Sequence, residues 1–354
     1  MNIYTPTLIY SEKNCVRNHS KELAATGKKA MIITGKKSSR VNGSLDDVIS
    51  VLKEEGRQYI IFDDVEENPS VETVMRARDI GISEGVDYVI GIGGGSPLDA
   101  CKAIALMIAN PQCRENVLFE NVMLRYIPVV TVPTTAGTGS EVTPYSILTI
   151  HESRTKKSIS HKIYPVLALV DYSYLKTASE NVTVNTAVDA LAHLVESFLN
   201  TNSNDLNRIY SEQGLRLFGK IKDKIKCPDE NTYMQLSNIA MIAGMAISHT
   251  GTSIPHGLSY SVTYELGMSH GKAVGIFLAG YVKMYENRTE SAKVLGFLGF
   301  RDYDEFSDYL SELLGKVSIS EELVKRNVEI LFENKAKLKN YPYNVTKKQL
   351  EELL

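Results

Sequence analysis

An aspartate and three histidines in the second half of the 354-residue chain have the types and spacing of metal ligands. Asp189 and His193 are four residues apart in an apolar segment, so on a helix their side chains project from the same face, one turn apart. His256 and His270 follow in a stretch rich in glycine. One carboxylate and three imidazoles suit Fe²⁺, Zn²⁺ or a similar ion and leave a position for a substrate oxygen. Asp189 and His193 alone would more often be core residues, but the two further histidines favour one metal ion held by all four.

A glycine-rich segment in the first half of the chain has the composition of a dinucleotide site. In the sequence GIGGGSPLDACKAIA, residues 91–105, a predicted strand brings Gly94 and Gly95 to a helix that we expect to begin at Ser96 and Pro97. Bare backbone N–H groups at such a helix start can approach a pyrophosphate, and the positive end of the helix favours an anion. An ordinary tight turn is the alternative, because the spacing departs from the GxGxxG fingerprint.

A second loop, PTTAGTGSE at residues 133–141, follows another strand of the buried type. It offers the hydroxyls of Thr134, Thr135 and Thr138, and it would leave the sheet at the carboxyl edge, where open α/β folds bind ligands. A long surface loop is the alternative, but the density of threonine and glycine favours a loop that wraps the same cofactor. We also assign to the cofactor site Asn68, Asp99, Ser146 and Lys157.

The elements that must position these residues follow two patterns. Up to about Asp171, short apolar strands alternate with helices, which indicates a mostly parallel sheet. The predicted strands are residues 29–34, 59–63, 88–92, 127–132 and 167–171, with helices opening near Ser44 and after a cap at Ser70. From about Ala178, amphipathic segments such as 185–199 and 235–248 replace the strands. We therefore expect an α/β dinucleotide-binding domain at residues 1–177 and an all-helical metal-binding and substrate domain at residues 178–354.

Composition limits the classes of partner. Lysine and arginine number 39 against 42 aspartate and glutamate residues, so no overall charge favours nucleic acid or a membrane surface. The four cysteines lack CxxC spacing, which argues against a disulfide framework or a thiolate zinc site and fits a reducing cytoplasm. The first residues lack a signal-peptide pattern, and no apolar run approaches the ~20 residues that a membrane span needs. We expect a cytoplasmic enzyme with a small-molecule substrate.

The four candidate ligands and the two loops together resemble the iron-containing (group III) alcohol dehydrogenase family. The ligands are separated by 4, 63 and 14 residues, as in that family, and GGGSPLD and PTTAGTGSEVT resemble its cofactor segments. The resemblance covers nearly the whole chain and is closest to butanol and 1,3-propanediol dehydrogenases. It implies a dehydroquinate synthase-like fold, an active site in the cleft between the two lobes, and a homodimer. The implied reaction is hydride transfer between NAD(P) and a small alcohol or aldehyde, with the ion as Lewis acid.

Tyr260 marks a departure from the family pattern. Many members carry a histidine four residues after the third metal ligand that is thought to help proton transfer, and here Tyr260 stands at that place. Tyr260 could bond to the substrate or to a relay water, or it could be a packing residue, in which case protons would pass by water or the cofactor ribose. His249 is the remaining imidazole in this region, and a structural or surface role is the better expectation for it.

The turn after the first core strand predicts a preference for NADP over NAD. Gly35 stands where relatives that prefer NAD have an aspartate, whose carboxylate would bond to the ribose 2′-hydroxyl and repel a 2′-phosphate. The residues after it, Lys36, Lys37, Ser38 and Ser39, offer charge-assisted and hydroxyl hydrogen bonds to a phosphate. A solvated basic turn is the alternative.

Rival functions exist on the same fold, namely a glycerol dehydrogenase or a lyase similar to dehydroquinate synthase. The TTAGTGSEVT loop and the set of four ligands favour the alcohol dehydrogenase branch. A catalytically inactive scaffold protein is a further alternative, which the intact ligand set disfavours.

Overall fold

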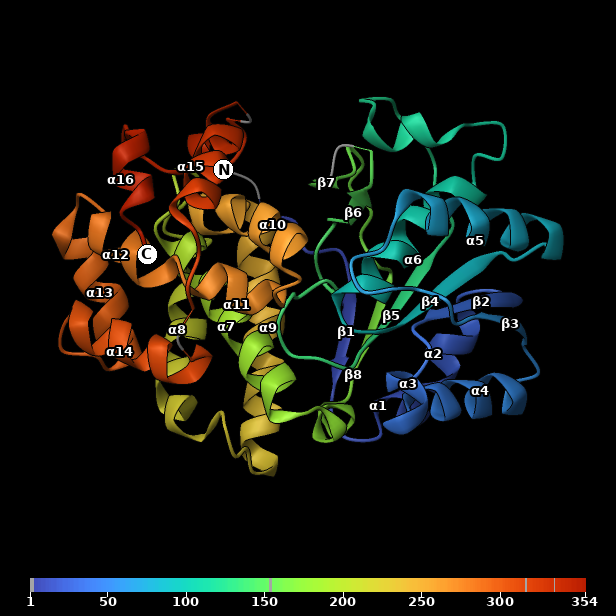
Figure 1. Cartoon of the computed structure of the whole chain (residues 1–354). Helices are drawn as coiled ribbons and strands as arrows, with labels where there is room; N and C mark the ends of the chain where they lie inside the picture. Colours follow the sequence, from blue (N-terminus) through green and yellow to red (C-terminus); the bar gives the residue numbers. More distant parts are fainter. Residues whose placement is uncertain (1–2, 153–154, 316, 334) are drawn as a thin grey trace. The chain divides into compact units, whose positions relative to one another are not determined.

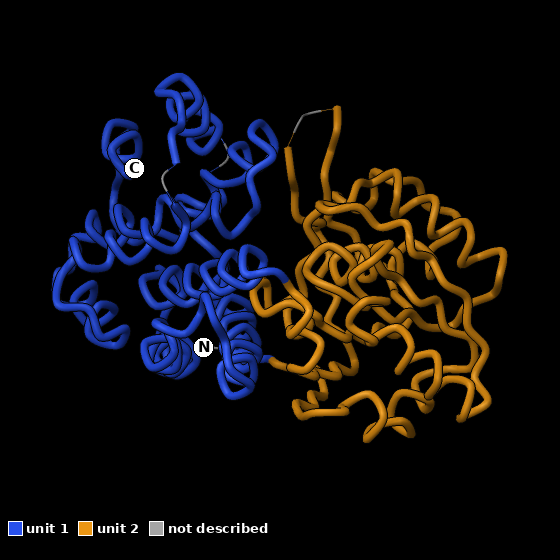
Figure 2. Tube along the Cα trace, turned by 60° about the horizontal axis from the view of Figure 1, so that its bottom comes forward, with its two compact units in different colours: residues 1–4, 179–354 blue, residues 5–178 orange. Residues whose placement is uncertain are grey.

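The computed structural model describes residues 3–152, 155–315, 317–333 and 335–354 (Figure 1). The chain divides into two compact units, which Figure 2 shows in different colours. One unit is Thr5–Ala178, and the other is Ser179–Leu354 together with the start of the chain up to Tyr4. Within the described residues, no helix combines the length and the apolar character that a membrane crossing requires.

The unit Thr5–Ala178 is built on a six-stranded sheet in which all paired strands are parallel. In spatial order, its strands are β1 (Leu8–Ser11), β8 (Leu167–Val170), β5 (Val129–Pro133), β4 (Tyr88–Gly93), β2 (Lys29–Thr34) and β3 (Gln58–Phe62). A separate antiparallel hairpin consists of β6 (Ile147–Ile150) and β7 (Thr155–Ser158). The helices are α1 (Cys15–Asn18), α2 (Ser20–Ala25), α3 (Ser38–Val41), α4 (Ser44–Glu54), α5 (Val71–Glu84) and α6 (Gly95–Ile108), with the 3-10 helices η1 (Glu115–Phe119) and η2 (Tyr172–Thr177). The predicted α/β fold with a mostly parallel sheet is confirmed.

Alternating side chains of the sheet feed two hydrophobic cores. In β2, Met31 and Ile33 belong to one core, whereas Ala30 and Ile32 belong to the other. The first core includes residues of α5 and α6, and the second includes residues of α1, α2 and α4. The sheet is therefore buried on both faces, as expected for parallel strands, and its apolar runs reflect this.

The chain leaves the neighbouring strands β2 and β4 towards opposite faces of the sheet. After β2 it passes through α3 to α4 on one face, whereas after β4 it enters α6 on the other. In open α/β sheets, ligands bind beyond the carboxyl ends of the strands at such a switch point. Since β5, β4 and β2 are neighbours, the Gly35 turn, the glycine segment and the threonine loop all begin at this edge.

Helix α6 begins one residue earlier than predicted, and Ser96 does not cap it. Gly94 is the N-cap residue, and Ser96 lies in the first turn, where its hydroxyl accepts a hydrogen bond from the backbone N–H of Asn68 at 3.0 Å. The chain enters the helix through Gly93, whose φ is 145°. A Cβ atom at Gly93 would lie 2.7 Å from Cγ of Pro97, so the sharp entry requires glycine.

The second unit is helical and contains no strand among the residues that the structure describes. Its helices are α7 (Glu180–Phe198), α8 (Arg208–Ile221), α9 (Glu230–Thr250), α10 (Ile254–Leu266), α11 (His270–Gly275), α12 (Leu278–Met284), α13 (Arg288–Leu298), α14 (Tyr303–Leu314), α15 (Glu321–Glu333) and α16 (Lys347–Glu351), with the 3-10 helices η3 (Lys222–Lys224) and η4 (Leu338–Asn340). Helix α7 packs against α8, α9 and α11. Helices α7 and α9 begin five residues before the predicted segments, because their polar first turns are capped by Ser179 and Asp229 and lie outside the apolar pattern.

Candidate metal centre and cofactor loops

Helix α7 positions the first two predicted ligands. Its residues from Ala187 to Phe198 are all buried, so Asp189 and His193 lie inside the helical unit with only 4% and 7% of their side chains exposed. Nε2 of His193 lies 3.8 Å from Oδ1 of Asp189. The four-residue spacing therefore places both groups on one face of the helix, as predicted.

The other two histidines come from α10 and α11 and meet the same carboxylate. Nε2 of His256 lies 3.4 Å, and Nε2 of His270 lies 3.7 Å, from Oδ1 of Asp189. Ligand atoms of Asp189, His256 and His270 all lie within 4.8 Å of one another, a group that could hold a metal ion. The ring of His193 stacks on that of His256, with 4.5 Å between centroids, so the structure brings all four residues together.

A close approach of two helices brings His270 to this centre. A Cβ atom on the next residue, Gly271, would lie 1.8 Å from the backbone oxygen of Asn185 in α7. Only glycine allows α11 to lie this close to α7. Gly267, in the left-handed conformation with φ 59°, ends α10 and reverses the chain before His270.

Glu196 belongs to the candidate metal centre but is not among the residues predicted from the sequence. It is fully buried, and its carboxylate accepts hydrogen bonds from Nδ1–H of His256 at 2.8 Å, from the backbone N–H of His256 at 3.1 Å, and from the backbone N–H of Ser253. The bond to Nδ1 fixes the orientation of the His256 ring, with Nε2 on the side of Asp189, and in the neutral imidazole it leaves Nε2 as the nitrogen that can bind a metal ion. The signal was present in the sequence, since Glu196 stands seven residues after Asp189 and so lies on the same helix face.

The electrostatics of this group fit a bound cation. Oδ1 of Asp189 and Nε2 of His256 are buried and have no hydrogen-bond partner in the described part of the chain. Burial acts to raise the pKa of Asp189, but His193, His270 and His256 together outweigh it and hold the pKa below the usual range of an aspartate. Burial acts to lower the pKa of His256, but the carboxylates of Glu196 and Asp189 raise it to about 9. The carboxylates thus stabilise positive charge at the place where the imidazole nitrogens converge, which a divalent cation would supply.

Tyr260 and His249 have different surroundings. The ring of Tyr260 stacks beside that of His270, with 6.1 Å between centroids, and Nζ of Lys337 lies 5.8 Å from its centroid. His249, at the end of α9, uses both ring nitrogens for backbone groups, since Nδ1 bonds to the oxygen of Met245 at 2.7 Å and Nε2 accepts the N–H of Tyr4 at 3.1 Å. Tyr260 therefore lies next to a predicted ligand, whereas His249 supports the backbone.

The glycine segment and the threonine loop are in direct contact in the other unit. The backbone N–H of Thr134 donates to the oxygen of Gly93 at 2.8 Å. A Cβ atom at Gly94 would lie 3.1 Å from Oγ1 of Thr135, and one at Gly95 would lie 2.6 Å from Cγ2 of Thr138. The predicted phosphate turn and the predicted cofactor loop thus lie together at the amino end of α6.

Several other predicted cofactor residues use their polar groups within the protein. The carboxylate of Asp99 accepts hydrogen bonds from Oγ–H of Ser140 and from the N–H of Ile147, and the hydroxyl of Ser146 donates to the oxygen of Asp99. Oδ1 of Asn68 accepts from Lys156 at 2.6 Å. Nζ of Lys157 lies 5.1 Å from the ring centroid of Phe119. These hydrogen bonds attach the β6–β7 hairpin and the residues just before it to α6, through Asp99, and to the segment before α5, through Asn68.

The turn after β2 is divided between exposed and buried groups. Lys36 and Ser38 are exposed, and Nζ of Lys36 lies 2.8 Å from Oδ1 of Asp64. Ser39 is fully buried, and its Oγ accepts a hydrogen bond from the hydroxyl of Thr34 at 2.9 Å. Ser39 therefore supports the turn from beneath. A Cβ atom at Gly35 would meet only the oxygen of Val65, at 3.4 Å.

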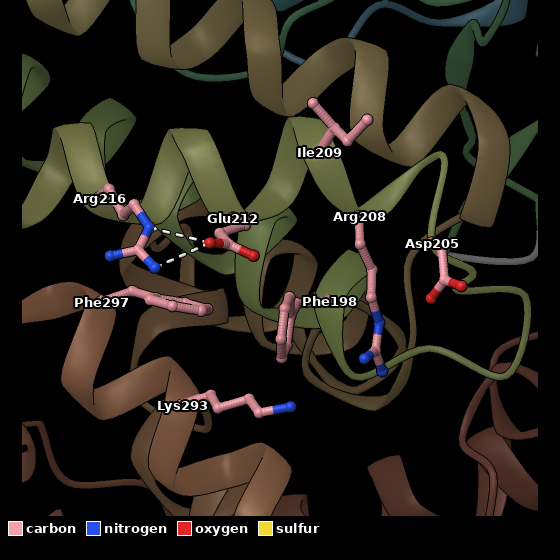
Figure 3. Close-up of a pocket in the computed structure, with 8 residues that line it drawn as sticks. All are labelled: Phe198, Asp205, Arg208, Ile209, Glu212, Arg216, Lys293 and Phe297. Carbon is pink, nitrogen blue, oxygen red and sulfur yellow. Dashed lines mark hydrogen bonds and ion pairs between the residues drawn. The ribbon is translucent and has the colours of Figure 1, made fainter.

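A surface pocket of about 450 Å³ in the helical unit is lined by none of the predicted ligands (Figure 3). It lies over α7, α8 and α13, and its cations are already engaged. Arg216 pairs with Glu212 at 2.8 Å, Arg208 pairs with Glu290 at 2.6 Å, and Lys293 also pairs with Glu290. Each of the three cations in the pocket thus already has an acidic partner.

Comparison with known proteins identifies the family. The family model of the iron-containing alcohol dehydrogenases matches residues 6–172, and the model of the C-terminal part of the Fe-containing family matches residues 183–345. A crystal structure of an iron-containing alcohol dehydrogenase from Thermotoga maritima is 34% identical and has a TM-score of 0.93, covering 99% of this chain and 98% of that chain. The chain belongs to the iron-containing alcohol dehydrogenase family.

Curated relatives of this iron-containing alcohol dehydrogenase include enzymes of similar and of greater length. An NADPH-dependent butanol dehydrogenase of Clostridium saccharobutylicum is 28% identical over 326 residues, which are 88% of this chain and 84% of that protein. An aldehyde-alcohol dehydrogenase of Streptococcus pneumoniae is 27% identical over 351 residues, and the match spans 39% of its length. A solved 1,3-propanediol oxidoreductase, 22% identical with a TM-score of 0.89, shares the fold. Membership in the family makes the chain an alcohol oxidoreductase.

Replacing Glu196 with glutamine should weaken metal binding roughly 10- to 100-fold while the protein stays folded. A glutamine offers one acceptor oxygen where the carboxylate offers two, so one of the three N–H groups that now bond to Glu196 would face an NH₂ group. Competition with a chelator measures the affinity, and circular dichroism checks the fold. The matched control is Ser197→Ala, which changes the next buried residue of α7 but leaves the bonds to His256 intact, and should bind metal normally. Wild-type affinity in Glu196→Gln would contradict this prediction, because it would show that neither the charge nor the second oxygen of the Glu196 carboxylate is needed for metal binding.

Proposed function

We propose that this chain is an NADP-linked, metal-dependent alcohol dehydrogenase and aldehyde reductase that acts on small alcohols such as butanol or 1,3-propanediol. The observation that carries the proposal is the convergence of Asp189, His256 and His270, with His193 beside them, inside a helical unit. We assign the cofactor to domain 1–177 and the metal ion to domain 178–354. We further propose that the enzyme is a cytoplasmic homodimer with no nucleic-acid or membrane partner.

The proposed ligands are Asp189, His193, His256 and His270. When bound, Fe²⁺ or Zn²⁺ would supply Lewis-acid stabilisation of the negative charge that develops on the substrate oxygen. The burial of Asp189 and His256 excludes water from one side of the centre, which strengthens electrostatic interactions there. His270 is the most exposed of the four, with 27% of its side chain accessible, so we propose that substrate approaches on its side.

The proposed cofactor contacts lie at the amino end of α6. Backbone N–H groups at Gly94, Gly95 and Ser96 and the positive end of this 14-residue helix would bind the pyrophosphate. The hydroxyls of Thr135 and Thr138 lie against Gly94 and Gly95 and would add hydrogen bonds to it. Further proposed cofactor residues are Gly35, Lys36, Ser38, Ser39, Asn68, Asp99, Thr134, Ser146 and Lys157.

Tyr260 is the proposed catalytic residue besides the ligands. Its place beside His270 would let its hydroxyl bond to the substrate or to a water that carries the proton. Glycerol dehydrogenase activity and a lyase reaction stay as alternatives on this fold, and only substrate assays separate them. The family match and the 28% identity to a butanol dehydrogenase favour the alcohol dehydrogenase reaction.

The main test of the proposed function replaces His193 or His270 with alanine. Each variant should lose tight metal binding and nearly all turnover but keep its fold, because the ligand is removed from the edge of the group while Glu196 still holds His256. Metal content by elemental analysis and turnover of C3 to C4 alcohols and aldehydes with NADPH and NADH are the measurements.

The control for the histidine variants is His161→Ala. His161 lies in the other unit and bonds to the oxygen of Val117, so its removal should leave metal content and turnover unchanged. Full activity with one metal ion per chain in His193→Ala or His270→Ala would refute the assignment of the ligands. An intact metal centre without turnover on alcohols would instead favour one of the alternative reactions.

A second test concerns the cofactor preference. Three cations, Lys36, Arg40 and Arg76, pair with the two carboxylates Asp63 and Asp64 near the Gly35 turn, so positive charge exceeds negative charge by one in this group. This charge and the open space at Gly35 should favour NADPH over NADH by roughly ten- to hundredfold, on the order of 1–3 kcal/mol. The measurement is kcat/KM with each cofactor.

Replacing Gly35 with aspartate should shift the preference towards NADH, through repulsion of the 2′-phosphate and a new acceptor for the ribose hydroxyl. Because φ at Gly35 is not in the left-handed region, the substitution should not strain the backbone. Ser83→Asp adds the same charge at an exposed position of α5 and should leave the ratio unchanged. Equal kcat/KM with NADPH and NADH in the unmodified enzyme would contradict the proposed preference for NADP. An unchanged ratio of the two values in Gly35→Asp would contradict the role of the Gly35 turn in that preference.

A further inference from the structure

A lysine with no exposed surface lies in the middle of α6. Nζ of Lys102 donates to Oγ of Ser140 at 2.7 Å, to the backbone oxygen of Tyr145 at 2.8 Å and to Oγ1 of Thr143 at 3.4 Å. The three N–H groups of the ammonium thus have three acceptors, all on the segment 140–145. An ammonium is costly to bury, and burial lowers the pKa of Lys102 to about 8. The charged side chain therefore needs these three acceptors to offset the cost of its burial.

Asp99, one turn earlier on α6, holds the same segment. The hydroxyl of Ser140 accepts from Lys102 and donates to Oδ1 of Asp99 at 2.6 Å. Oδ2 of Asp99 accepts the N–H of Ile147 at 2.8 Å, and its backbone oxygen accepts the hydroxyl of Ser146 at 2.7 Å. Lys102 and Asp99 therefore fix both ends of residues 140–147 against one face of the helix, mostly through side chains of α6.

The other end of the same loop lies over the start of α6. Thr134 bonds to Gly93, and Thr135 and Thr138 lie against Gly94 and Gly95. The threonine loop is thus held at two places, at its start by the end of β4 and after Gly139 by Lys102 and Asp99. The residues between these two attachments are those that face the glycine turn.

We infer that Lys102 is a positioning residue for the cofactor, which acts by holding the threonine loop against the phosphate-binding start of α6. The inference deepens the proposed function and rests on it, because it takes the loop as part of the cofactor site. Lys102 is buried beneath the loop and does not itself need to touch the cofactor. Replacing Lys102 should release the loop and expose the glycine turn. Cofactor binding would then also have to order the loop, which lowers the affinity.

Hydrogen exchange and cofactor affinity together test this inference on the full chain. Lys102→Met keeps a side chain of similar length but removes the three donors. In the cofactor-free protein, amides of residues 134–147 should exchange at least tenfold faster, and the Kd for NADPH, measured by titration, should rise roughly 10- to 100-fold. Metal content should not change, because the metal ligands belong to the other unit.

The matched control is Ile104→Ala, which removes buried side-chain volume from the same helix without touching the loop's polar contacts. It should lower the free energy of unfolding but leave loop exchange and NADPH affinity near the wild-type values. Ser140→Ala removes one of the three acceptors of Lys102 and the hydroxyl that donates to Asp99, and leaves the other contacts of both residues in place. It serves as the milder variant, with a smaller effect in the same direction, if Lys102→Met folds poorly.

Each outcome decides a separate point. Unchanged loop exchange in the folded variants would overturn the inference, because Lys102 would then not hold the loop. Faster exchange with an unchanged Kd for NADPH would also overturn it, because cofactor binding would then not depend on a held loop. A weaker Kd in Ile104→Ala equal to that in Lys102→Met would also overturn it, since general destabilisation would explain both. Failure of the unmodified protein to bind NADPH or NADH would refute the proposed function, and the exchange result alone would then decide whether Lys102 holds the loop.

Discussion

A buried carboxylate needs compensating positive charge, and this requirement organises the helical unit. Asp189 is almost fully inside the unit, where an unpaired charge would cost several kcal/mol. Three imidazoles from α7, α10 and α11 face its Oδ1 within 3.8 Å. Glu196, a second buried carboxylate, orients His256 towards Asp189. A cation would stabilise the two acids and three imidazoles that converge in the core. The ion that compensates the buried carboxylates would thus also be the ion that the proposed reaction requires.

In the α/β unit, charged side chains hold the loops at the carboxyl edge of the sheet. The parallel strands β5, β4 and β2 end side by side, and the loops that leave them must be held without a core of their own. Here Lys102, which is fully buried, and Asp99 hold the threonine loop through hydrogen bonds from α6 to residues 140–147. Glycines then allow the loop and the helix start to lie within contact distance. In both units a buried charged group fixes backbone that carries the proposed chemistry.

Much of this arrangement could be predicted from the sequence, because it depends on local periodicity. The spacing of Asp189 and His193 on one helix face and the run of glycines after a strand require no tertiary information. Tertiary partners could not be predicted in this way. The hydroxyls of Ser39 and Ser96 suggest ligand contacts, yet they bond to Thr34 and to the N–H of Asn68, which only the folded chain brings close. Glu196 carried a signal in its seven-residue spacing from Asp189, but its partner His256 is sixty residues away.

The location of a bound metal ion tests this account most directly. Crystals of the protein loaded with Fe²⁺ or Zn²⁺, measured at the absorption edge of that metal, report the position of the ion without reference to activity. We expect one anomalous peak per chain, within coordination distance, about 2.0–2.2 Å, of Asp189 oxygen and of the imidazole nitrogens of His193, His256 and His270. A peak elsewhere, or no peak in protein that turns over alcohols at its full rate, would contradict the account.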